Sequence, residues 1–337
     1  MRRLLLADRI KGRADSFLAP LIPALQRDWE VRFVSLPPGA KLAAAIAWCD
    51  VLWLEWCWDH AVWATREGLA GGRPTILRLH SVEALNTDYP ARVDWSRVDR
   101  LVTVGEDIAE LIRGRVPGVS PIVIPNGVDL ERFHPAPSRA EPRRVGRVAW
   151  VGHIEPKKNP MLLLQIAARL RGTHEFHVAG PFTDLRTRRY VLHLAATLGL
   201  AGTLHLHGQV ADMPGFLADK DVILSTSMYE SFGLNIAEGM ACGLAPVVHD
   251  FPGADRLWPP QALFASIDEA VALIRAAQPG SPWREWVGRY GLDRQIQATR
   301  QLLAGLRSTP DGRPAGAVRS GIQTASSVAD PASATAP

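Results

Sequence analysis

The chain has 337 residues, of which 47% are hydrophobic, and a formal net charge of +4. No apolar run approaches the roughly 20 residues of a membrane-spanning helix, and the three cysteines, Cys49, Cys57 and Cys242, are too few for a disulfide scaffold. Charges of both signs are scattered along the sequence, which argues against a nucleic acid partner. We expect a cytoplasmic protein of two domains, with at most peripheral association at the inner face of the cell membrane.

Short apolar runs alternate with helical patterns along the whole sequence. This alternation predicts βαβ units, parallel sheets and an α/β fold with two Rossmann-like domains that face each other across a cleft. Ligands of such sheets bind beyond the carboxyl ends of the strands. The predicted strands are 2–7, 31–35, 50–56, 74–80, 100–105 and 121–127, then 147–154, 175–180, 204–210, 221–227 and 245–250.

Composition divides the chain into five parts. Prolines and polar residues around 133–142 predict an interdomain linker at 136–145, between a first domain at 1–135 and a second at 146–282. The stretch 283–306 reads as helical, with a break near Tyr290 and Gly291. Residues 307–337 are rich in Ala, Ser, Pro and Gly, which predicts disorder.

The first half places polar and aromatic side chains at the ends of its predicted strands. Gly12 is the one glycine in the loop after the first strand, and His80 ends the strand at 74–80. Glu83, three residues on, is placed to orient His80 by accepting an N–H. Tryptophans beyond a strand end either stack on sugar rings or pack at domain contacts, and both interpretations stay open. The residues concerned follow the strand at 50–56: Glu55, Trp56, Trp58 and Asp59.

The most informative stretch lies in the second half, at 227–243. Glu230 follows a buried strand, the chain turns at Gly233, and a helix runs until Gly243 ends it. The amides of Phe232, Gly233 and Leu234 lie at the start of this helix, where free N–H groups bind phosphate. Carboxylates suit diols rather than phosphates. Glu230 and Glu238 therefore predict a ligand with phosphate between two polyols, such as a nucleoside-diphosphate sugar.

This stretch resembles the E-x7-E motif of retaining glycosyltransferases with the GT-B fold, most like family 4, and the resemblance runs in register from about 99 to 253. It implies that Glu230 binds the hydroxyls of the donor sugar and Glu238 the ribose. It also implies a C-terminal helix that crosses back to the first domain. The plain alternative is an ordinary strand–loop–helix unit with one exposed and one capping glutamate.

The start of the second domain resembles the family's G-R-x-x-x-x-K segment, which clamps the donor diphosphate. Lys158 falls at the lysine position, with Lys157 beside it, and His153 takes the place of the arginine. Histidine lacks the bidentate fork of arginine, so the clamp differs on that side. The resemblance implies that Lys158 and the Gly233 loop stabilise the leaving phosphate, and that His80 is the family's cleft histidine.

Further resemblances carry fewer consequences. PNGVDLERF, at 125–133, matches a stretch near the family's hinge and is interpreted as a fold marker. Gly208, Gln209 and Val210 match the loop that contacts the nucleobase. His205 and His207 lie two apart on one strand face, as in a metal pair, but no third ligand is evident from the sequence.

The function predicted is a retaining glycosyltransferase that uses a nucleoside-diphosphate sugar and transfers to a glycan, glycolipid or small-molecule acceptor. For this function we expect no metal and no other cofactor. Two alternatives remain: a non-hydrolysing nucleotide-sugar epimerase, and a non-catalytic partner subunit that binds the nucleotide sugar. A dehydrogenase is disfavoured because no G-x-G-x-x-G follows the first strand of either domain.

Overall fold

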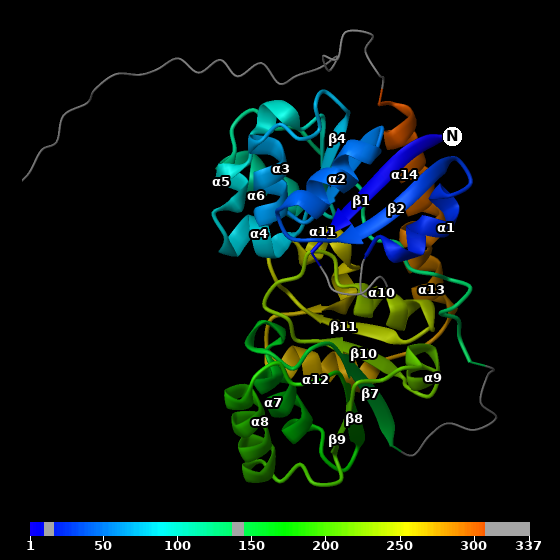
Figure 1. The fold of residues 1–337 in the computed structure, drawn as a ribbon. Helices are drawn as coiled ribbons and strands as arrows, with labels where there is room; N and C mark the ends of the chain where they lie inside the picture. The colour runs from blue at the N-terminus through cyan, green and yellow to red at the C-terminus, as the bar shows by residue number, and fades with distance from the viewer. Residues whose placement is uncertain (10–16, 137–144, 307–337) are drawn as a thin grey trace, which may run out of the picture.

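The computed structural model describes residues 1–9, 17–136 and 145–306. Gly12, most of the predicted linker and the predicted disordered tail lie outside the described residues. Two parallel sheets of six strands each form two lobes, one above the other in Figure 1. The predicted α/β architecture is confirmed.

The first lobe is a sheet of order β2-β1-β3-β4-β5-β6 with helices on both faces. Its strands are β1 (Arg2–Asp8), β2 (Trp29–Ser35), β3 (Val51–Glu55), β4 (Thr75–Leu79), β5 (Arg100–Thr103) and β6 (Pro121–Val123). Its helices are η2 (Ala19–Leu21), α1 (Ile22–Leu25), α2 (Ala40–Trp48), α3 (Asp59–Arg66), α4 (Ser81–Asn86), α5 (Tyr89–Arg92), η3 (Trp95–Arg97) and α6 (Glu106–Arg115).

The second lobe repeats the plan with the order β12-β11-β10-β7-β8-β9. Its strands are β7 (Gly146–Val151), β8 (His174–Ala179), β9 (Leu204–Gly208), β10 (Val222–Ser225), β11 (Ala245–His249) and β12 (Leu263–Phe264). Its helices are η4 (Pro156–Lys158), α7 (Pro160–Arg169), α8 (Leu185–Thr197), α9 (Met213–Leu217), α10 (Leu234–Ala241), α11 (Ala254–Leu257), η5 (Pro260–Ala262), α12 (Ile267–Ala276), α13 (Ser281–Val287), η6 (Gly288–Tyr290) and α14 (Leu292–Ala304).

The central strands, such as β3, β4 and β10, are buried on both faces, as parallel strands covered by helices must be. Alternation along β1 illustrates this: Leu5 packs in the cluster that holds Leu42 and Ile46 of α2, whereas Leu4 and Leu6 face the opposite layer. The central strand β1 thus contributes to two cores, which fixes its register.

The C-terminal helical stretch divides between the two lobes. α13 packs on α10 of the second lobe, and α14 returns to the first lobe beside β1 and β2 (Figure 1). Leu303 of α14 is fully buried with Leu4 and Leu6. Gly291 separates the helices and pairs with Val128 in an isolated bridge. The predicted crossing helix and its break near Tyr290 and Gly291 are confirmed.

Candidate active site

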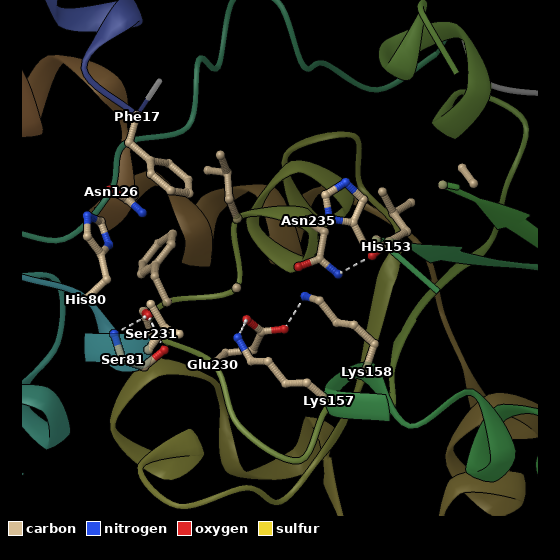
Figure 2. A pocket seen from close by; sticks show the side chains of 18 of the residues that line it. Phe17, His80, Ser81, Asn126, His153, Lys157, Lys158, Glu230, Ser231 and Asn235 are labelled. Atoms are coloured by element: carbon tan, nitrogen blue, oxygen red, sulfur yellow. Dashed lines mark hydrogen bonds and ion pairs between the residues drawn. The ribbon is translucent and has the colours of Figure 1, made fainter. Parts of the chain in front are cut away.

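A pocket of about 420 Å³ lies between the two lobes, beyond the carboxyl ends of their strands. This is the place where open α/β sheets bind ligands. Figure 2 shows Lys157 and Lys158 reaching toward Glu230, with His80 and Asn126 at the other end of the pocket. The first lobe contributes Phe17, Trp56, His80, Ser81, Val82 and Asn126, and the second lobe contributes the remaining lining residues.

Glu230 and Lys158 form the charged centre of the second-lobe wall. The Glu230 carboxylate pairs with Lys158 Nζ, lies 3.6 Å from Lys157 Nζ and accepts a hydrogen bond of 2.7 Å from Ser227 Oγ. Burial raises the pKa of Glu230, but the two lysine charges outweigh burial and hold it below its usual range. The sequence predicted separate roles for Lys158 and Glu230, and the structure brings both groups into direct contact.

The start of α10 presents unpaired amides beside this ion pair. Gly233 has φ +89°, and a Cβ there would lie 2.9 Å from Ile236 Cδ1 and 3.2 Å from Trp258. Only glycine fits this turn without strain. Within the described residues, the amides of Phe232, Gly233 and Leu234 donate to no protein acceptor. Asn235 Nδ2 donates to Val151 O at 2.9 Å and fixes the helix start against β7. The arrangement suits an anionic ligand.

The other predicted donor residues lie at different distances from the pocket. His153 is exposed and lines it, as do Gln209 and Val210. Gly208 ends β9 just before this loop and is not among the lining residues. Glu238 lies one helical turn beyond Leu234 on α10 and does not line the pocket either. Burial raises the pKa of Glu238 to about 7, with a weaker opposing effect of Arg132.

The first-lobe wall rests on a buried carboxylate, Glu55. Its Oε1 lies 2.8 Å from His80 Nε2 and 3.6 Å from Arg78 Nη1, and its Oε2 accepts a hydrogen bond of 3.0 Å from Trp53 Nε1. Arg78 in turn donates to Asn126 Oδ1. Burial raises the pKa of Glu55, but the Arg78 charge and the His80 contact keep it below its usual range.

The predicted pairing of His80 with Glu83 is wrong. β3 and β4 are parallel neighbours in which Glu55 lies opposite Arg78, so Glu55 reaches His80 at the end of β4. Glu83 belongs to the first turn of α4, where its Oε1 accepts a hydrogen bond of 2.8 Å from the Cys57 amide. Burial raises the pKa of Glu83 to about 8.

The contact between His80 and Glu55 determines which ring nitrogen of His80 carries the proton. Burial lowers the pKa of the imidazole, although Glu55 opposes that shift, so the ring is neutral. An ionised Glu55 accepts a hydrogen bond from the Nε2–H group, which leaves a lone pair on Nδ1 of His80. The ring packs against Trp56 and Phe17, with centroid distances of 4.1 and 5.3 Å.

The predicted acceptor residues separate into two groups. Trp56 lines the pocket and has φ +70°, a conformation that is uncommon outside glycine and clusters at functional sites. Glu55 is fully buried beneath His80 rather than exposed to an acceptor. Trp58 stacks edge-on with Tyr89, and Asp59 pairs with Arg9 at 3.2 Å, so neither is among the lining residues.

Sequence reasoning missed several lining residues that depend on the meeting of the lobes. The Ser81 amide donates to Ser231 Oγ at 2.9 Å, and the two hydroxyls lie 2.6 Å apart (Figure 2). Asn126 was included only in the fold marker at 125–133. Phe17 lies in no recognised motif, whereas Ser231 and Asn235 lie within the recognised stretch at 227–243 and could have been included.

The two facing lobes, the pocket between them and the returning α14 are the features of the GT-B fold, and solved structures of that class share it. Anabaena HepE in complex with UDP-glucose superposes with a TM-score of 0.75 at 18% identity, over 91% of this chain and 100% of the other. Sucrose-phosphate synthase from Thermosynechococcus elongatus superposes with a TM-score of 0.72 at 16% identity, over 90% and 100% of the two chains.

Sequence comparison finds similarity to a protein family within the second lobe. Residues 138–259, which include Lys158, Glu230 and Glu238, match the model of the family described as glycosyl transferases group 1. D-inositol 3-phosphate glycosyltransferase of Geodermatophilus obscurus is 37% identical over 175 residues, or 45% of this chain and 38% of the relative. Its Mycobacterium bovis counterpart is 33% identical over 162 residues, 44% and 33% of the two chains. The match thus spans between a third and two fifths of these relatives.

Proposed function

We propose that the chain transfers a sugar, with retention of anomeric configuration, from a nucleoside-diphosphate sugar to an acceptor hydroxyl. The observation that carries this proposal is the Lys158–Glu230 pair beside the open amides of the α10 start, in a pocket that His80 faces from the other lobe. The group 1 domain match and the names of the relatives support the transfer activity. The UDP and UDP-glucose complexes of HepE support a nucleotide-sugar donor.

Each group has a role in the proposed reaction. Negative charge grows on the leaving phosphate as its bond to the anomeric carbon breaks, and Lys158 and the amides of Gly233 and Leu234 stabilise that charge. Glu230 orients the sugar by accepting hydrogen bonds from its hydroxyls. The acceptor oxygen bonds to the anomeric carbon from the same face, and its proton passes to the leaving phosphate. The lone pair on His80 Nδ1 accepts a hydrogen bond from a hydroxyl of donor or acceptor.

No metal takes part in this proposal, because Lys158 and the helix start supply the positive charge that the diphosphate requires. The proposed sugar transfer takes place in the cytoplasm, and the protein contacts the cell membrane at most peripherally. The three cysteines are free and buried, which suits a reducing compartment. None of the helices in the described ranges is long and apolar enough to span a membrane.

The test is a panel of UDP-, GDP- and ADP-sugars incubated with purified protein, with and without acceptors, in the presence and absence of EDTA. We expect nucleotide release that depends on an acceptor and survives EDTA, with an α-linked product from an α-linked donor. Inositol phosphate belongs among the acceptors because of the relatives' names. Epimerised donor without an acceptor would favour the epimerase, and binding without turnover under every condition would favour the partner subunit.

Glu238 gives a pH prediction for donor binding. A ribose diol donates hydrogen bonds to the ionised carboxylate, whose pKa in the free protein is about 7. Donor affinity should therefore fall about tenfold from pH 8 to pH 6, because the carboxylate must first lose its proton. Calorimetry with a nucleotide sugar, whose phosphates do not titrate in this range, measures it.

The matched variant is Glu238→Gln, which cannot ionise. It should bind the donor more weakly at pH 8 and lose the pH dependence. An unchanged pH slope in the variant would remove Glu238 from the ribose site and leave the rest of the proposed function intact.

A further inference from the structure

Four polar side chains gather on one face of the second sheet, away from the pocket. Glu175 and His177 lie on β8, and His205 and His207 lie on its parallel neighbour β9, with His177 opposite His205. Side chains alternate along a strand, so residues two apart project to the same face. The sequence showed the pair on β9 but not its partners on β8. None of the four is among the residues that line the pocket.

The potential ligand atoms of three of these residues converge. His177 Nε2 lies 3.4 Å and His205 Nε2 lies 3.9 Å from Glu175 Oε2, and the ligand atoms all lie within 4.8 Å of one another. Ligands bound to zinc at 2.0–2.2 Å in a tetrahedron are about 3.3–3.5 Å apart. Small side-chain rotations are therefore enough to close the cluster on one ion.

The nitrogens that face the carboxylate have no hydrogen-bond partner. His177 Nε2 and His205 Nε2 are both buried and unpaired within the described residues, and the His177 side chain is only 9% exposed. A buried polar atom without a partner is costly and uncommon in a native protein. A cation between these two nitrogens and Glu175 Oε2 would satisfy all three atoms at once.

His207, two residues after His205 on β9, contacts the ring nitrogen of His177 that faces away from Glu175. Its Nε2 lies 3.1 Å from His177 Nδ1. When His177 donates from Nδ1 to His207, its Nε2 carries a lone pair that points toward the Glu175 carboxylate. Metal-bound histidines commonly donate their other N–H to such an acceptor, which fixes the ring orientation.

Two cations, Arg147 and Lys220, border the cluster. Arg147 Nε lies 3.5 Å from Glu175 Oε2, and both Arg147 and Lys220 also pair with Asp219. Arg147 can therefore keep its partner Asp219 when Glu175 turns toward an ion. Two imidazoles and one carboxylate favour zinc and similar transition metals over Mg²⁺ or Ca²⁺, which prefer oxygen ligands.

We propose that Glu175, His177 and His205 bind a divalent transition-metal ion, with Zn²⁺ the best fit, and that His207 orients His177 from behind. β9 is the edge strand of the second sheet, and the ion would fasten it to β8. The loop at 209–210 follows β9 directly and supplies Gln209 and Val210 to the pocket wall. The ion therefore has a structural role in holding this loop, and it takes no part in sugar transfer.

Untagged full-length protein, stripped of metal with a chelator, is titrated with Zn²⁺ against a chromophoric competitor, and its thermal unfolding is followed. We expect one Zn²⁺ per chain and a higher unfolding temperature with Zn²⁺ than without it. Co²⁺ in place of Zn²⁺ should give visible absorption bands of a low-symmetry site.

His205→Ala and Glu175→Gln should each weaken Zn²⁺ binding at least tenfold, whereas His193→Ala, which removes an exposed histidine of α8, should leave it unchanged. A cooperative thermal unfolding transition of each metal-free variant shows that it folds. His205→Ala is the variant least expected to disturb the fold, because the His205 side chain is 38% exposed. Absence of a bound equivalent, or equal affinity in the His205→Ala and His193→Ala variants, would overturn the proposal. Neither result depends on transfer activity.

Discussion

Replacing Lys158 by alanine is expected to lower kcat for sugar transfer by roughly 10²–10³-fold, the loss typical of removing one preorganised group that stabilises developing charge. Lys158 Nζ pairs with Glu230 in the free protein, and its side chain is only 16% exposed, so water screens it little. Lys157 is 42% exposed and lies 3.6 Å from the same carboxylate. The Lys157→Ala variant should therefore lose much less activity.

The two lysine variants form a matched pair, because each removes one cation from the same carboxylate. Initial rates with saturating and limiting donor separate the loss in kcat from a rise in KM, and thermal unfolding of each variant checks that it folds. Lys158→Arg, which keeps the charge, should recover part of the rate. If Lys157→Ala and Lys158→Ala lost equal activity, the assignment of Lys158 to the leaving phosphate would be wrong.

The donor wall was accessible from the sequence because its parts are local. Glu230, Gly233 and the start of α10 lie within a few residues of one another, so a strand–turn–helix pattern places them together without knowledge of tertiary packing. The alternation of apolar runs likewise predicted both parallel sheets, because a strand buried on two faces must be apolar along its length.

The first-lobe wall could not be derived in the same way. Glu55 ends a strand whose other residues are apolar and fully buried, and only the register of β3 against β4 shows that it meets Arg78 and His80. Ser81 and Ser231 lie 150 residues apart and meet only when the lobes close on each other. Two members of the proposed metal cluster, Glu175 and His177, lie on a different strand from the histidine pair that the sequence displayed. In each case the missing information is a pairing between distant segments.

Glu55 leads to the prediction with the largest effect on stability. The Glu55→Gln variant should be less stable by about 3–5 kcal/mol, the usual cost of leaving one member of a buried ion pair without its partner. Arg78 is 1% exposed and would keep its charge with only the neutral Asn126 amide as a hydrogen-bond partner. Urea unfolding at pH 7, followed by tryptophan fluorescence, measures the difference because Trp53 donates to Glu55 and reports on this core.

Glu83 supplies a matched control, because it is a second fully buried glutamate in the same lobe with the opposite protonation state. Its pKa of about 8 means that it is largely protonated at pH 7, and glutamine resembles a protonated glutamate in shape and charge. Glu83→Gln should therefore cause no loss of stability at pH 7, where Glu55→Gln is costly. Equal losses in the two variants would contradict the assigned charge states.

The stability of the two variants relative to the wild type should depend differently on pH. The pKa of Glu55 is lower in the folded than in the unfolded state, so its contribution is present above about pH 4.3, the unfolded value, and is lost as pH falls through the folded pKa. Glu83 has a raised pKa, so the folded protein loses stability as pH rises from about 4.3 toward 8. Between pH 5 and pH 8, Glu83→Gln should gain stability relative to the wild type, whereas the deficit of Glu55→Gln should stay constant because Glu55 is ionised throughout that range. A deficit in Glu55→Gln that shrank toward pH 8 would show that Arg78 does not hold Glu55 in its ionised form.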